Sequence, residues 1–204
     1  MKKILSLILI VASLLTVLVS CDLGGGGDDA AKYGLVTEGG KQYFIAEGGA
    51  ILLDGTAASS VAAPTVTATL ESKKFTAPET SEAHFTYELV SGKVNITGLT
   101  DAGKSAGVVI IPKTIDGKTI ASISSLEGAK SVVFADLGYG INLNSGCFKG
   151  VSNVFICCVA DNLLVAQSGL LEGSSANVYV SADEISNFKS HYNWSAYADS
   201  LKKF

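Results

Sequence analysis

Residues 98–105 carry glycines, a lysine and a serine at a spacing that can bind phosphate. The run reads Gly-Leu-Thr-Asp-Ala-Gly-Lys-Ser, which matches the pattern of a phosphate-binding loop. Such a loop leads into a helix, because the amide groups of the first helical turn face the phosphates. Here Ser105 precedes the β-branched run Val108–Ile111 and Pro112, which predict a strand. We therefore expect a turn at 98–105 and no bound nucleotide.

Ser105 also occupies the central position of a Gly-x-Ser-x-Gly pattern, formed by residues 103–107, which is typical of a hydrolase nucleophile. Several aspartates and then His191 follow it, in the chain order that these enzymes use. The pattern works on a strand, a sharp turn and a helix, and the strand predicted after Ser105 argues against it. We expect no catalytic serine, and we expect that the protein is not an enzyme.

The remaining metal-ligating and nucleophilic side chains do not form a recognisable site. His84 and His191 are far apart in the sequence, and the chain has neither Cys-x-x-Cys nor His-Glu-x-x-His. We expect His84 on a solvated strand edge and His191 in the last turn of a C-terminal helix, where a cation complements the helix dipole. No metal ion and no other cofactor are predicted.

Three cysteines follow Cys21, an odd number that is unusual outside the cytoplasm. Cys147 is expected in the core. Cys157 and Cys158 are adjacent in a strand, so at most one of them faces inward. A disulfide from Cys147 to either one is left open, and no catalytic thiol is expected because no histidine is near.

Residues 1–20 are predicted to be a signal peptide. Lys2 and Lys3 are followed by the apolar run Ile4–Val19, which is short for a membrane span. The segment Leu18–Cys21 resembles the lipobox of bacterial lipoproteins, which implies that Cys21 is acylated and becomes the first residue of the mature chain. The alternative is an ordinary secretory signal that a cysteine follows by coincidence.

Residues 21–32 are expected to be a tether, because Gly24–Gly27 and the aspartates around them form no stable element. The N-terminal acyl chains then attach the protein to a membrane of the cell envelope, with the outer surface favoured over the periplasmic face. The chain has 204 residues, no arginine and a formal charge of −4. Nucleic acid is therefore not an expected partner, because its binding needs a basic surface.

The elements behind these residues predict a mostly β protein with minor α content. Residues 33–84 form a small β-rich N-terminal region, with short apolar runs that glycine pairs separate. In residues 85–204 four β-like stretches recur, and their second residues are spaced by 23, 22 and 24 positions. A period in the low twenties predicts a solenoid that adds one strand per coil. The alternative is a sandwich whose strands fall at even intervals by chance. The stretches begin at Val108, Ser131, Asn153 and Asn177.

The coils resemble the BspA-like, or type 5, leucine-rich repeats of bacterial surface proteins. Residues 110–123 match the opening of such a coil, with its Ile-Pro step, and residues 147–154 match its Phe-x-Gly segment. The chain departs from the family pattern at Cys147 and Val151, where the family has alanine and cysteine. The resemblance spans about 85–204 and implies a short, degenerate leucine-rich-repeat solenoid with a role in adhesion or host-matrix binding.

A C-terminal helix is predicted to cap the solenoid. The segment Ser181–Glu184 has the pattern of a capping box, and Ile185, Phe188 and Tyr192 follow on one helical face. Trp194, with the tyrosine three residues later, is expected to cover the exposed core of the last coil.

The third residues of the four repeat strands are expected to point outward and to form an apolar ladder with steps of about 4.8 Å. These residues are Ile110, Val133, Phe155 and Tyr179. If the ladder is exposed, it is expected to form a binding surface; the alternative is that the N-terminal strands cover it.

The first hypothesis is a non-enzymatic, lipid-anchored surface protein that binds protein or glycan. The second is an accessory subunit of an envelope complex that faces the periplasm. The third is a hydrolase that uses Ser105 or a carboxylate pair.

Overall fold

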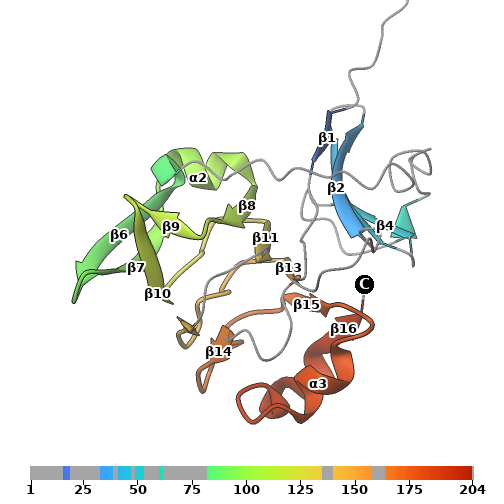
Figure 1. Ribbon diagram of the computed structural model, residues 1–204. Coiled ribbons are helices and arrows are strands. Elements are labelled where there is room, and N and C mark those ends of the chain that lie inside the picture. The colour runs from blue at the N-terminus through green and yellow to red at the C-terminus, as the bar shows by residue number, and fades with distance from the viewer. Residues whose placement is uncertain are drawn as a thin grey trace, which may run out of the picture.

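The computed structural model describes residues 82–134, 140–157 and 164–203, together with five short N-terminal strands. The chain is mostly β with a few short helices, as the sequence predicts (Figure 1). No helix in these described parts is long and apolar enough to cross a membrane. The N-terminal strands are β1 (Thr16–Leu18), β2 (Tyr33–Glu38), β3 (Lys41–Ala46), β4 (Gly49–Leu52) and β5 (Ser60–Val61).

The four predicted repeat strands are confirmed, and they lie side by side in one parallel sheet. The valines at positions 109, 132, 154 and 178 are in register across it. A fifth strand near the C-terminus, which the sequence analysis did not predict, completes the sheet. The strands are β8 (Val108–Ile111), β11 (Ser131–Phe134), β13 (Asn153–Ile156), β15 (Asn177–Val180) and β16 (Leu201–Lys203).

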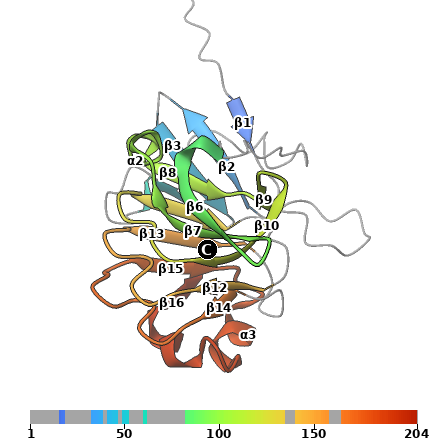
Figure 2. The same cartoon turned by 90° about the vertical axis from the view of Figure 1, so that its left-hand side faces the viewer.

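A second sheet faces the first. Its parallel strands are β7 (Lys93–Leu99), β10 (Lys118–Ile123), β12 (Ile141–Leu143) and β14 (Leu164–Ala166), and β6 (Phe85–Val90) pairs antiparallel at the edge. From β8 to β15 the chain alternates between the two sheets, so that each circuit contributes one strand to each of them (Figure 2). The short strand β9 (Thr114–Ile115) forms a hairpin with β10.

The core lies between the two sheets as rows of apolar side chains, one row for each register position. The four aligned valines are at most 1% exposed. The opposite sheet adds Val94, Ile96, Ile123 and Leu143, each fully buried. Burying one such side chain contributes about 1.5 to 3 kcal/mol, so each row makes a similar contribution to the stability of the fold.

The N-terminal strands form an antiparallel sheet in the order β1-β2-β3-β4-β5. This confirms strands within the predicted β-rich region 33–84, although residues 62–81 of that region lie outside the described residues. Strand β1 falls inside the predicted signal peptide and pairs with β2. Removal of residues 1–20 would therefore take one strand from this sheet and leave β2 as its edge.

The C-terminal segment covers the last coil, but its local structure differs from the prediction. Helix α3 (Ile185–Ser190) begins after Glu184, which makes no side-chain cap hydrogen bond, so the expected capping box at 181–184 is wrong. Phe188 is buried as expected, whereas Tyr192 is 79% exposed because the helix ends before it.

Trp194 is fully buried, as the sequence predicts, and its Nε1 donates to the Leu164 carbonyl at 2.7 Å. The 3-10 helix η3 (Ser195–Ser200) follows. Within it, the Tyr197 hydroxyl donates to the carbonyl of Gln167 at 2.6 Å and accepts from the Leu170 amide at 3.0 Å. These contacts fix the C-terminal segment on β14 and the turn after it.

Candidate functional site

The apolar ladder forms as predicted but is not an open surface. Ile110, Val133, Phe155 and Tyr179 are in register across the first parallel sheet. The rings of Phe155 and Tyr179 stack with centroids 5.0 Å apart and planes 10° apart. All four side chains are at most 9% exposed, so the expectation of an exposed binding ladder is wrong.

Phe44 from the N-terminal sheet covers the centre of the ladder. Its ring lies 4.3 Å from that of Phe155, at an interplanar angle of 17°, and is itself 1% exposed. Phe44, Phe155 and Tyr179 thus form a continuous stack of three rings, in which burial raises the pKa of the Tyr179 hydroxyl. This contact agrees with the alternative expectation from the sequence, in which the N-terminal strands cover the ladder.

The outer face of the second sheet is polar and remains accessible. Its outward positions alternate with buried core positions along most of β7 and along β12 and β14. We call this set the polar face. It consists of Glu88, Asn95, Ser122, Ser124, Asn142, Asn144 and Gln167, all exposed or half-buried. The sequence analysis missed it, because strands β12 and β14 have only three residues each and show too little alternation to be recognised.

Hydrogen bonds between side chains hold the polar face in place across every strand boundary of this sheet. Asn95 Nδ2 donates to Glu88 Oε1 at 2.8 Å, and Ser122 Oγ donates to Asn95 Oδ1 at 2.7 Å. Further along the sheet, two more side-chain bonds join neighbouring coils, from Asn144 to Ser124 at 3.1 Å and from Gln167 to Asn142 at 3.2 Å. The amides and hydroxyls are therefore ordered before any ligand arrives, which lowers the entropic cost of binding.

Another row of polar residues lies at the start of the strands in the first sheet, where it stabilises the fold. Ser131 and Asn153 are fully buried, and Asn153 Nδ2 donates to Ser131 Oγ at 3.4 Å. Lys202 closes the row on the last strand with a 2.6 Å bond from Nζ to Asn177 Oδ1. Buried amides of this kind are stable only when they are paired, and these pairs fix the register of the coils.

The segment 98–105 contains a helix where the sequence analysis expected a turn. Helix α2 (Asp101–Ala106) begins after Thr100, whose side chain accepts from the Gly103 amide at 3.2 Å, and ends at Gly107, which has a φ of 71°. The lysine and serine of the pattern lie in the last turn of this six-residue helix rather than at the start of a longer one. The helix therefore presents no N-terminal amides after the lysine, and the geometry of a phosphate-binding loop is not formed.

The two histidines lie in different places from those expected. His84 belongs to the 3-10 helix η1 (Glu82–His84) rather than to a strand edge, and its carbonyl accepts from the Thr100 amide at 3.0 Å. His191 is the residue that ends α3, and its Nδ1 accepts from the Asn193 amide at 3.3 Å. Within the described residues, no three His, Cys, Asp or Glu side chains gather as metal ligands.

Cys147 and Cys157 are both buried, and no disulfide joins them. Cys147 is fully buried, which confirms its predicted place in the core, and burial raises its pKa to about 12. A thiol with such a pKa stays protonated at neutral pH and is a poor nucleophile. Cys21 and Cys158 lie outside the described residues.

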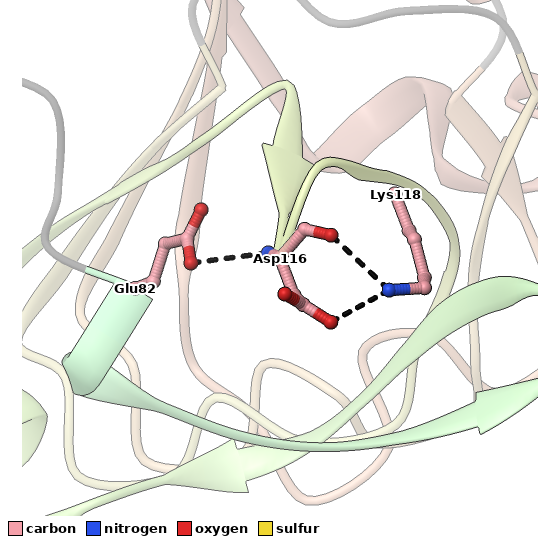
Figure 3. Close-up of polar contacts among 3 residues, drawn as sticks. All are labelled: Glu82, Asp116 and Lys118. Carbon is pink, nitrogen blue, oxygen red and sulfur yellow. Dashed lines mark hydrogen bonds and ion pairs between the residues drawn. The ribbon is translucent and has the colours of Figure 1, made fainter.

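One charged cluster lies at the β9–β10 hairpin (Figure 3). Lys118 Nζ donates to Asp116 Oδ2 at 2.6 Å and to the Asp116 carbonyl at 3.2 Å, and Glu82 Oε2 accepts from the Asp116 amide at 3.0 Å. Asp116 and Gly117 both have positive φ, as a two-residue hairpin turn requires. The bond to Asp116 raises the pKa of Lys118. The cluster is therefore structural, because these contacts hold the β9–β10 turn against η1.

Comparison with known proteins finds no matching family model, no matching curated protein and no matching solved structure.

Proposed function

We propose that this chain is a non-enzymatic, lipid-anchored protein of the cell envelope that binds a glycan through the polar face. The alternation of the chain between two parallel sheets supports a short leucine-rich-repeat solenoid of the BspA-like type. The lipobox-like segment before Cys21 supports anchoring through acyl chains, with the domain at the outer surface.

The ordered polar face is the observation that carries this proposal. It offers amide and hydroxyl groups in repeated steps of about 4.8 Å from strand to strand. Such groups donate and accept hydrogen bonds at once, which suits the hydroxyl groups of a sugar polymer. The apolar ladder, by contrast, is already occupied by Phe44.

A blocking substitution at the centre of the polar face tests the proposal. Ser122 is half-buried on the middle strand β10, and Ser122→Arg would cover the neighbouring amides with a long charged side chain. The matched control is Ser186→Arg on the exposed side of α3. We expect the full-length protein in detergent to bind immobilised polysaccharides, and Ser122→Arg alone to abolish that binding. Equal binding by both variants would remove the polar face as the binding surface.

Protease treatment of intact and lysed cells tests the location. Digestion on intact cells supports adhesion at the outer surface. Protection until lysis contradicts surface adhesion and supports the second hypothesis, an accessory subunit that faces the periplasm. In both the intact and the lysed cells, the protein is detected with an antibody against the C-terminal segment, which contains the buried Trp194.

A further inference from the structure

Strand β6 is the edge of the second sheet, and among the described residues no strand pairs with its outer side. It joins β7 through a two-residue turn, in which Ser91 and Gly92 have φ values of 51° and 77°. In such a hairpin the residues that flank the turn, Val90 and Lys93, share hydrogen bonds, and so does every second pair after them. The backbone amide and carbonyl groups of Tyr87 and Leu89 therefore point away from β7.

Exposed apolar side chains gather on the same strand. Four large apolar residues in the described parts of the chain are exposed, and three of them lie in β6. They are Tyr87 at 39%, Leu89 at 50% and Val90 at 54%. An open strand edge together with exposed apolar side chains is the usual basis for pairing with another strand.

Edge strands normally carry features that prevent such pairing, and residues 87–90 have few of them. There is no proline or lysine in this run, and the register shift of the hairpin falls between Thr86 and Tyr87. Its one charge, Glu88, is engaged by Asn95. The opposite edge of the sheet, β14, is covered by the contact of Trp194 with the Leu164 carbonyl.

We propose that β6 pairs antiparallel with β6 of a second copy of this chain, joining the two second sheets into one. The strand is complementary to itself. A two-fold axis through Tyr87 or Leu89 brings the outward-pointing backbone groups of the two copies into register. It also places each of these apolar residues opposite its own copy, whereas Glu88 then faces Thr86 or Val90 of the second copy rather than the other Glu88.

Cysteine cross-linking of the full chain in cell membranes tests the pairing. Tyr87→Cys and Leu89→Cys are each opposite themselves in one of the two registers, and Tyr192→Cys is the matched control on an exposed aromatic far from β6. We expect mild oxidation to give a reducible dimer for at least one β6 variant. The parent chain, with its native cysteines, and Tyr192→Cys should give at most a background level. Equal dimer from all variants, or an adduct whose mass does not correspond to two chains, would overturn the proposal.

Sedimentation of the full chain in detergent provides the second test. The wild-type protein should sediment with twice the protomer mass, and Leu89→Lys, which places a charge at the edge, should sediment as the protomer. Blue-shifted Trp194 emission would verify that Leu89→Lys is folded. A wild-type protein that stays monomeric at all concentrations refutes the dimer. Because glycan binding by the polar face is measured separately, failure of one proposal leaves the other to be judged on its own result.

Discussion

At the scale of single residues, the three-ring stack decides how the N-terminal sheet relates to the repeat strands. Phe44 and Phe155 come from strands more than a hundred positions apart, and both rings are buried. Stacked pairs of this kind contribute about 0.5 to 1.5 kcal/mol beyond the burial of their area.

A double-mutant cycle on Phe44 and Phe155 measures this contact. Phe155→Ala should lower the free energy of unfolding by about 3 to 5 kcal/mol, because it leaves a cavity under the stack. The coupling energy with Phe44→Ala should be about 1 kcal/mol in urea unfolding. Tyr192→Ala, on an exposed ring, serves as the control and should change stability by less than about 0.5 kcal/mol. Additive losses at positions 44 and 155 would mean that the two rings do not touch.

The buried thiol of Cys147 gives a pH-dependent prediction. Its pKa rises from 9.0 to about 12 on folding, because burial disfavours the thiolate. The unfolded chain loses this proton at lower pH than the folded chain, so stability is full below pH 9 and falls between pH 9 and 12. Urea unfolding at several pH values should show this decline. Cys147→Ala should be less stable at pH 7 and should lose less of its stability as the pH rises; parallel curves for both proteins would contradict the assignment.

At the scale of elements, sequence patterns identified long-range order better than local detail. The valine positions predicted the register of four strands, because each coil must bury the same position. Helix α2 was missed because the β-branched residues after Ser105 seemed to forbid it, yet Gly107 ends the helix before they begin. The sequence could not show whether the ladder is covered. Periodicity predicts which side chains point away from the core, but it does not predict which other segment of the chain packs against them. The polar face was missed because β12 and β14, with three residues each, are too short to show a pattern.

Helix α2 gives a prediction that runs against helix propensity. Gly103 is buried in its middle, and a Cβ at this position would collide with the carbonyl of His84. Gly103→Ala should therefore destabilise the protein by about 1 to 3 kcal/mol, although alanine favours helices. Ser105→Ala on the exposed side of the helix is the control and should leave stability within about 0.5 kcal/mol. Thermal unfolding followed by circular dichroism separates the two, and a stabilised Gly103→Ala would show that η1 can move away.

At the scale of the whole molecule, the coils should unfold together. Neighbouring circuits share one continuous core, and the chain contains a single tryptophan, which is buried in the C-terminal cap. In denaturant, the red shift of Trp194 emission and the loss of β-sheet circular dichroism should have the same midpoint. Trp194→Phe removes the hydrogen bond to Leu164 and should lower stability by about 1 to 3 kcal/mol. An earlier midpoint for the emission would mean that the cap detaches first.

The shared register of the valines would also allow a circuit to be removed from the chain or added to it, which changes the length of the protein. Residues 132–153 span one complete circuit, and their removal would place Val154 against Val109 with the same partners on both sides. In the proposed solenoid each circuit would interact mainly with its neighbours, so such a deletion or a duplication would alter the number of layers while the two ends keep their structure. The separation between the β6 end and the C-terminal cap can thus vary in increments of about 4.8 Å, which gives evolution a means to adjust reach without redesigning the surface.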